Sequence, residues 1–298
     1  MQEKVLENKR LQYIDIAKGI AMICIILGHM GNANINRVVF TFHVPIFFFI
    51  TGYFISDKCE VNIFVRNKVR TLIIPYIITC LAIVIIATLQ GAICGDAIVE
   101  IKKWSYASVY GAGDSYTNPF YIPGIGAIWF LLATFWGSIF LRMSLNFNKY
   151  IRLFSIAVIF AIGYYSRKLF WFPLSIQAGA CATLFMYMGN LLNLTKDIIK
   201  EIPNEVKKFG IGFAMVTWYF FIKDFQSFWL VHCDIGRGIV DIFGSMCACA
   251  MVILISRTID IKTKKMDYVL EESHHHMNNQ FQPLYFAVRI SSNPLNKL

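Results

Sequence analysis

The apolar stretch from Tyr13 to His29 constrains this chain most, because it is long enough to cross a bilayer and yet carries three ionisable side chains. These side chains are Asp15, Lys18 and His29. Ionisable groups are unfavourable in the hydrocarbon region, so they mark a polar path or site inside a helix bundle. At about 100° per residue, an ideal helix brings Lys18 to within about 20° of His29, and Asp15 to within about 40°. The three side chains are therefore predicted to share one face.

The composition agrees with a membrane protein, since 57% of the 298 residues are hydrophobic and only 15% are charged. Eight apolar segments are predicted as helical spans, at residues 12–30, 38–55, 72–93, 126–141, 151–166, 172–194, 210–222 and 238–256. The fold class is therefore an all-α, polytopic transmembrane helix bundle of about eight spans. We expect the protein to lie in a lipid bilayer.

The positive charges indicate an orientation. The net charge of +10 could suggest nucleic-acid binding, but the Lys and Arg residues alternate from loop to loop. Eighteen of the 28 fall in segments that would share a side with the N-terminus, and seven fall in the loops on the opposite side. Because cytoplasmic loops are enriched in Lys and Arg, we expect a multi-pass protein of the cytoplasmic membrane with a cytoplasmic N-terminus and no nucleic-acid partner.

This orientation places His29 and His43 together in the outer half of the first two spans. Pro45 is expected to kink the second span or open its hydrogen-bond ladder beside His43. Two alternatives stand for His43, a substrate-orienting residue or a structural partner of the break. Trp129, near the outer end of its span, is predicted either as a stacking platform for a sugar or as an interfacial anchor.

A basic run precedes the third span on the inner side. It contains Arg66, Lys68 and Arg70, and either it is a positive-inside signal or it binds the phosphates of a ligand. Both interpretations require the cytoplasmic side. On the opposite side, the segment from Trp104 to Tyr121 is predicted to be the longest outer loop, rich in Gly, Tyr and Ser, and could receive an acceptor substrate.

Several motifs resemble those of one known family. They are Arg10-x-x-Tyr13-Ile-Asp15-Ile-Ala-Lys18-Gly19 leading to Gly28-His29, Phe42-His43-Val-Pro45-Ile-Phe-Phe-Phe-Ile-Thr-Gly52-Tyr53-Phe54, the basic run before Ile74-Pro75-Tyr76, and Ile128-Trp129-Phe130-Leu131. Together they resemble acyltransferase family 3, integral membrane enzymes that modify sugars of bacterial surface and secreted glycans. The resemblance covers about residues 10–256.

The resemblance implies acyl transfer, usually from acetyl-CoA on the cytoplasmic side to a carbohydrate or glycolipid hydroxyl presented across the membrane. It implies acyl-CoA as a donor substrate, and we expect no permanently bound cofactor and no metal. Lys18 and His29 fit the family signature of a basic residue, ten intervening residues and a histidine. His29 is the predicted general base, and Asp15 is expected to pair with Lys18 at three residues' separation.

The basic run fits the family less well. The family carries an Arg-x-x-Arg element in this inner loop, and Asn67 stands in the place of its first arginine when Arg70 is the second. Arg66 or Lys68 would have to substitute for the missing arginine. These three basic residues are predicted to bind the phosphates of the acyl donor.

Two other classes of function are compatible with ionisable residues in spans. A secondary transporter or glycan exporter uses such residues, but it should contain internal repeats, and the two halves of this sequence show no convincing repeat. A non-catalytic membrane scaffold would not need Lys18 and His29 on one helix face. The enzyme is therefore the favoured interpretation.

The C-terminal part departs from the family. Residues 1–260 are predicted as the transmembrane acyltransferase domain, and residues 261–298 as a polar, disordered or aberrant tail. Because members usually have about ten spans, we expect the last spans of the family to be missing here. The corresponding hypothesis is that this truncation leaves the chain inactive.

Overall fold

The computed structural model describes residues 11–117 and 120–263 and shows two compact units. Of the described residues, those between 18 and 251 form one unit, and residues 11–17 and 252–263 form the other. In the described part of the chain, extended pairing is limited to two isolated bridges, Tyr116–Ile122 and Trp229–Asp234, and the regular structure is helical. The predicted all-α fold class is confirmed.

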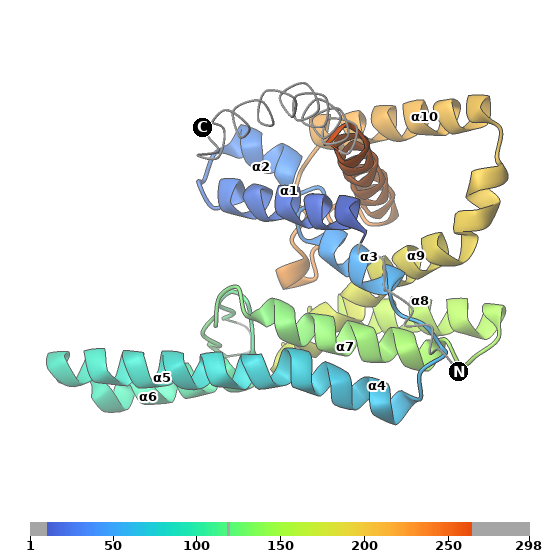
Figure 1. Ribbon diagram of the computed structural model, residues 1–298. Coiled ribbons are helices and arrows are strands. Elements are labelled where there is room, and N and C mark those ends of the chain that lie inside the picture. The colour runs from blue at the N-terminus through green and yellow to red at the C-terminus, as the bar shows by residue number, and fades with distance from the viewer. Residues whose placement is uncertain (1–10, 118–119, 264–298) are drawn as a thin grey trace, which may run out of the picture. The chain divides into compact units, whose positions relative to one another are not determined.

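Helix α9 (Ile176–Glu201) is the helix around which the larger unit packs. It contacts α3 (Pro45–Tyr53), α7 (Trp129–Ser144) and α8 (Lys149–Ser166) (Figure 1). Small residues let these helices approach α9 closely. The small residues on its buried face include Ala178, Gly179, Ala180 and Ala182.

Helices α3 and α9 cross at two glycines. A Cβ atom on Gly52 would overlap the backbone of Met186, and a Cβ atom on Gly189 would overlap the carbonyl group of Phe49. Neither position can accept a side chain unless the two helices move apart. Gly52, which belongs to the second sequence motif, therefore has a packing role.

The predicted span at residues 38–55 is broken in two. Helix α1 (Gln12–Gly28) is followed by α2 (Ala33–Val39), a turn over residues 40–44, and α3, which begins at Pro45. Pro45 lies in the first turn of α3, where its missing N–H removes no helical hydrogen bond. The expected interruption at this proline is confirmed, and His43 lies in the turn before it.

The third predicted span is part of a longer helical rod. Helix α4 (Val61–Lys68), the π-helical turn η1 (Val69–Ile73) and α5 (Ile74–Cys94) run together over 34 residues. Pro75 explains the π turn, because in a regular helix its ring would collide with the carbonyl group four residues earlier. The basic run therefore lies on the same rod as the apolar span, and not in a separate loop.

Helix α6 (Ala97–Tyr110) folds back along α5 (Figure 1). The reversal occurs at Gly95, whose φ of 88° favours glycine. At the other end of α6, the hydroxyl of Tyr76 donates a hydrogen bond of 2.7 Å to the carbonyl of Ser108. The predicted loop from Trp104 to Tyr121 is thus wrong in its first part, since α6 continues to Tyr110.

Two helices in the described residues are long and apolar enough to cross a membrane. They are the rod Val61–Cys94 and the last helix, Ile239–Thr263. Each of the eight predicted segments falls on helix, including α10 (Asn204–Lys223). However, α1 has 17 residues and α3 only nine, fewer than a usual span needs. The number of spans therefore stays a prediction.

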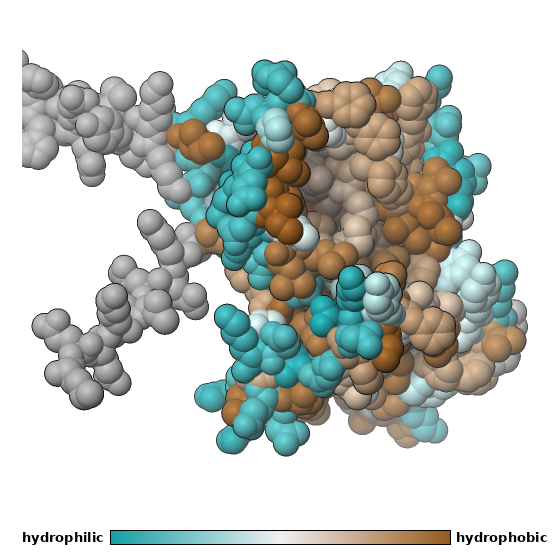
Figure 2. Space-filling model, turned by 90° about the vertical axis from the view of Figure 1, so that its right-hand side faces the viewer, coloured by the Kyte–Doolittle hydropathy of each residue, from teal (hydrophilic) through white to brown (hydrophobic). Residues whose placement is uncertain are grey.

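Apolar side chains also cover outward-facing surfaces of the helices. Phe154 on α8 and Phe209 on α10 are both largely exposed. Figure 2 shows apolar side chains, in brown, over much of one face of the molecule. Water-soluble monomers rarely expose large continuous apolar patches. This surface fits a protein that lies in a membrane.

The smaller unit contains the start of α1 and the end of the last helix. Within it, the guanidinium group of Arg257 lies over the ring of Tyr13, 5.4 Å from its centroid. Ile14 and Val252 are buried. Residues 261–263 continue the last helix, and the rest of the predicted polar tail lies outside the described residues.

Candidate functional site

One side of α1 carries two of the predicted site residues. Lys18 and His29 are both exposed, in contrast to the position inside a helix bundle that the sequence suggests. Met22 and Ile26, which lie between them at helical spacing, are exposed as well. In the larger unit, the basic residue and the imidazole therefore occupy the same side of α1. Asp15 is half-buried in the first turn of α1, in the smaller unit, and its pairing with Lys18 stays a prediction.

His43 is held by the end of α2. Its Nδ1 lies 2.8 Å from the carbonyl oxygen of Val39, near the helix end, where carbonyl groups lack partners within the helix. A carbonyl oxygen can only accept a hydrogen bond, so Nδ1 must donate. In the neutral ring, Nε2 is then left as an acceptor. The helix break therefore fixes one tautomer of His43.

The structure places His29, directly after α1, and His43, directly before α3, near the ring of Phe40. Phe40 packs between α1 and His43: a Cβ atom on Gly28 would lie 2.6 Å from its ring, and its ring stacks on the imidazole of His43 with centroids 4.8 Å apart. The two predicted imidazoles thus form one cluster.

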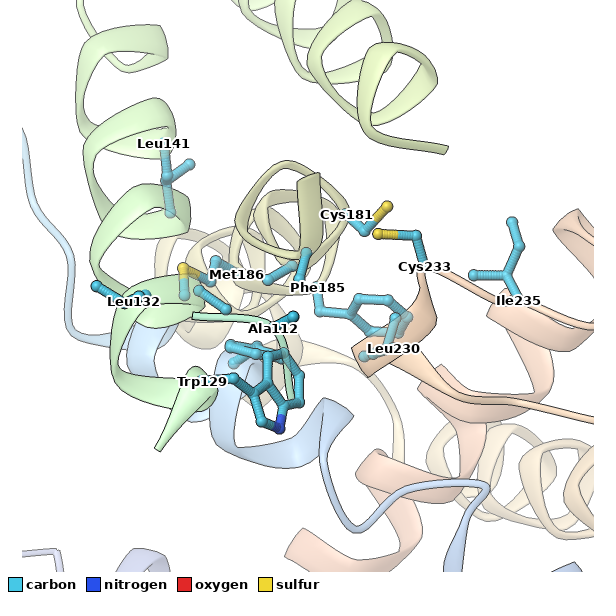
Figure 3. Close-up of a cluster of buried hydrophobic side chains, with 14 of the residues drawn as sticks. Ala112, Trp129, Leu132, Leu141, Cys181, Phe185, Met186, Leu230, Cys233 and Ile235 are labelled. Carbon is cyan, nitrogen blue, oxygen red and sulfur yellow. The ribbon is translucent and has the colours of Figure 1, made fainter. Parts of the chain in front are cut away.

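Trp129 lies in the core of the larger unit. Only 8% of the residue is exposed, and its ring contacts the edges of Phe48 and Phe130. Figure 3 shows it in the cluster of buried apolar side chains with Leu132 and Phe185. A stacking platform needs an accessible ring face, so the observed position of Trp129 is that of a packing residue. Its contact with a sugar stays a prediction.

The basic run lies on α4 and η1. Arg66 and Arg70 are exposed, while Lys68 is half-buried with its Nζ 5.4 Å from the ring centroid of Phe64. In the part of the chain that the structure describes, no hydrogen bond or ion pair joins these residues to His29. The structure therefore presents the basic run and the imidazole pair as two separate groups.

A buried arginine on α7 positions the loop before the basic run. Arg142 is 4% exposed. Its Nη2 donates to the carbonyl groups of Cys59 at 2.6 Å and Asp57 at 3.1 Å, and its Nη1 donates to Asn146 at 2.7 Å. Nearby, Nδ2 of Asn190 donates to the carbonyl of Ile55 at 2.6 Å. Together these donors fix residues 54–60, from which α4 starts.

A histidine that the sequence analysis missed completes a row of rings. Nε2 of His232 lies 3.2 Å from Oδ2 of Asp114. The ring of His232 lies beside that of Trp229, with centroids 5.7 Å apart, and Trp229 contacts Phe40 edge-on at 5.6 Å. We call Phe40, Trp229 and the described histidines (His29, His43, His232), with Asp114, the histidine row. Every histidine in the described residues belongs to it.

The loops that carry this row are fixed by a half-buried tyrosine, Tyr116. The hydroxyl of Tyr116 donates a hydrogen bond of 2.8 Å to the carbonyl of Val231. Burial raises the pKa of Tyr116, so the hydroxyl keeps its proton and remains a donor. Burial also raises the pKa of Cys233, two residues after Val231, so its thiol stays protonated.

The described residues hold no group of three or more His, Cys, Asp or Glu side chains suited to a metal ion. Their chemistry is instead that of an imidazole pair and a carboxylate–imidazole pair, each able to accept or donate protons. The arrangement can thus support proton transfer to or from a bound hydroxyl compound.

Fold and site together describe an all-helical protein with apolar outer surfaces and with two imidazoles near a helix break. The family model of acyltransferase family 3, an acyltransferase domain, matches residues 11–266. This match covers most of the 298 residues, and the chain therefore belongs to that family of membrane acyltransferases. The comparisons with curated proteins and with solved structures found no match.

Proposed function

We propose that the protein transfers an acetyl group from acetyl-CoA, on the cytoplasmic side, to a carbohydrate hydroxyl of an envelope or exported glycan. The observation that carries this proposal is that Phe40 connects the end of α1, where His29 follows, with His43 beside a helix break, in a chain of this family. A sugar hydroxyl is a weak nucleophile at neutral pH and needs a base within hydrogen-bond reach. The family match favours this enzyme over a transporter.

His29 is the general base in this proposal. It accepts the proton of the sugar hydroxyl while the hydroxyl oxygen attacks the thioester carbonyl. A C–O bond forms, the C–S bond breaks, and the proton passes from the imidazole to the departing thiolate. The products are an O-acetyl sugar and free CoA, and His29 returns to its neutral form. Such a base contributes about 10²- to 10⁴-fold to the rate, and positioning of the two substrates supplies much of the rest.

His43 orients the acceptor hydroxyl. Support comes from its hydrogen bond to Val39, which leaves Nε2 as an acceptor, and from its contact with Phe40, which holds the ring plane. Lys18, on the same side of α1 as His29, meets part of the acyl donor. Asp15 pairs with Lys18 and so lowers the free energy of placing a charge within the membrane.

The basic run binds the phosphates of the acyl donor. Arginine forks and lysine charges suit a ligand with several phosphate groups. The exposure of Arg66 and Arg70 and the fixed start of α4 support this role. Because the run and the imidazole pair are separate groups, an extended molecule such as acetyl-CoA is a better fit than a compact one.

The proposal is tested with membranes that contain the protein, incubated with radiolabelled acetyl-CoA and cell-envelope glycans. We expect His29→Ala to lower label transfer by about 10²- to 10⁴-fold, and Lys18→Ala to lower it as well, at unchanged protein levels. Met30→Ala, at an exposed position next to His29, is the control and should transfer label normally. Unchanged transfer by His29→Ala would exclude the general-base role.

The donor site is tested with a second substrate, acetyl-CoA without its 3′-phosphate. Replacement of Arg66 and Arg70 by alanine should raise the KM for intact acetyl-CoA and leave the maximal rate nearly unchanged. The same double variant should discriminate less between the two donors. Lys196→Ala, at an exposed basic position on α9, is the control. An equal KM for both donors in the unmodified protein would contradict phosphate binding.

A further inference from the structure

The loop that carries Trp229 and His232 has a strained backbone that the core holds in place. Trp229 and Asp234 exchange two backbone hydrogen bonds of 2.9 and 3.0 Å around the short helical turn Leu230–His232. Cys233 closes this loop at a φ of 52°, a conformation that residues other than glycine rarely adopt. Such strain persists only where the surroundings enforce it, and it is concentrated at functional sites.

Buried anchors enforce this conformation. Leu230 is 3% exposed and Cys233 is fully buried. In Figure 3 both side chains point into the buried cluster, and the sulfur atoms of Cys233 and Cys181 face each other. With these two residues held inside, Trp229 remains 43% exposed and the side chain of His232 remains 26% exposed. The loop therefore presents one aromatic ring and one imidazole from a rigid base.

A second loop, described over residues 111–117 and 120–128, brings Asp114 to the same place. The bridge between Tyr116 and Ile122 closes this loop, and the bond from Tyr116 to Val231 ties the two loops together. Gly113 lies against Val231, where a Cβ atom would overlap that side chain. The ring of Tyr116 also contacts His232 edge-on, with centroids 5.1 Å apart. His232 is thus fixed from both loops.

Asp114 retains hydrogen-bonding capacity. Its Oδ1 accepts a hydrogen bond of 2.7 Å from the backbone N–H of Ser115, and its Oδ2 faces His232. An ionised carboxylate has about four acceptor positions, so about two remain. Its side chain is 57% exposed, which makes those positions accessible. Because Nε2 of His232 donates to Asp114, Nδ1 of its neutral ring is an acceptor.

We infer that Asp114, His232 and Trp229 form a binding subsite for a sugar ring of the acceptor glycan. An exposed indole face offers apolar area to the C–H groups of a sugar, while a carboxylate and an imidazole accept hydrogen bonds from its hydroxyls. This inference rests on the proposed function and specifies where its acceptor binds. Through Phe40, which contacts both Trp229 and His43, the subsite leads to the imidazole pair.

The experiment measures carbohydrate binding without acyl transfer. Fluorescently labelled full-length protein in detergent is applied to a glycan array that carries fragments of bacterial envelope polysaccharides. We expect the unmodified protein to bind at least one fragment, and Trp229→Ala and His232→Ala to weaken that binding at least tenfold. Asp114→Asn, which keeps the shape of the side chain, should weaken it less.

Controls separate this inference from the proposed function. Tyr121→Ala removes an exposed aromatic ring from the same loop as Asp114 and should bind as the unmodified protein does. His29→Ala should lose acetyl transfer and keep glycan binding. Thermal unfolding shows that each variant is folded, and His232→Gln replaces His232→Ala if that variant unfolds. Absence of bound glycan, or equal binding by the Trp229 and His232 variants, would overturn the subsite even if acetyl transfer occurs.

Discussion

The two ends of α7 use polar side chains in opposite ways. At the C-terminal end, Arg142 is buried and donates to the backbone of residues 54–60 and to a neighbouring side chain. At the N-terminal end, near Trp129, the polar groups are Asp114 and His232, which pair with each other and remain partly exposed. We call these the Arg142 end and the Trp129 end.

The two ends differ in what their polar side chains are available to do. At the Arg142 end, Nη2 of Arg142 donates to two main-chain carbonyl groups that would otherwise lack this donor, so its role is to hold the loop before α4. At the Trp129 end, the side chains keep accessible acceptor positions, so they can exchange their partners for a ligand. The comparison predicts large effects on stability at the first end and small effects at the second.

The largest loss of stability is expected at the α3–α9 crossing, beside the Arg142 end. Gly189→Ala places a methyl group into the carbonyl group of Phe49, and we expect a loss of about 3 kcal/mol in unfolding free energy or a failure to accumulate in membranes. Thermal unfolding in detergent measures this loss. In the control, Gly210→Ala, the added atom meets nothing within 4 Å, and helix propensity should stabilise α10 slightly. Equal melting temperatures for Gly189→Ala and the unmodified protein would be inconsistent with the close crossing.

The next largest effect is expected for Arg142→Leu. This change leaves the carbonyl groups of Asp57 and Cys59 without their donor, and each buried unpaired group costs about 1–3 kcal/mol. The same unfolding measurement applies, with Lys149→Ala, at an exposed position on α8, as the control. Glycan binding should be unchanged in Arg142→Leu. If binding fell while the protein remained folded, the two ends would not be independent.

A smaller effect is expected for the turn that holds His43. Nε1 of Trp218 donates to the hydroxyl of Thr41 at 2.9 Å, and that hydroxyl donates to the carbonyl of Val38 at 2.6 Å. Trp218→Phe removes the first bond and should lower stability by about 1 kcal/mol. Measurements on Trp218→Phe, Thr41→Val and the double variant give the coupling between the two side chains. A coupling of zero would show that the hydrogen bond does not contribute.

The smallest effect on stability is expected at the Trp129 end. His232→Ala removes a partly exposed contact with Asp114, and its unfolding free energy should stay within about 0.5 kcal/mol of the unmodified value. If His232→Ala lowered the unfolding free energy as much as Arg142→Leu, the proposed difference between the two ends of α7 would be wrong. His232 would then be a structural residue like Arg142.

Local patterns predicted much of the fold. The first apolar stretch, expected over residues 12–30, forms α1 over residues 12–28, because most of its residues are apolar and no proline interrupts it. The interruption at Pro45 follows from the chemistry of proline. The prediction was wrong for the end of α6. The Gly, Tyr and Ser content around Trp104–Tyr121 is typical of loops, but the residues as far as Tyr110 form a helix that packs along α5.

The candidate site was only partly predictable. His29 and His43 lie close together in the sequence, so helix geometry and a short connection suffice to relate them. Asp114 and His232 are 118 residues apart, and only the tertiary fold brings them together. Trp129 shows the converse, because residue type suggests a sugar platform but burial depends on neighbours such as Phe48. The exposed tryptophan of the structure is Trp229.

The π turn η1 also has a consequence for how the rod can change. Each residue of an α-helix rotates the chain by about 100°, so a turn that accommodates an extra residue sets the angular phase of the helix after it. The buried face of α5, which includes Tyr76 and Cys80, is therefore rotated about the helix axis relative to the basic residues of α4. Converting η1 into a regular α-helical turn would rotate the basic residues of α4 about the helix axis relative to the buried face of α5. No residue of α4 or α5 would have to change.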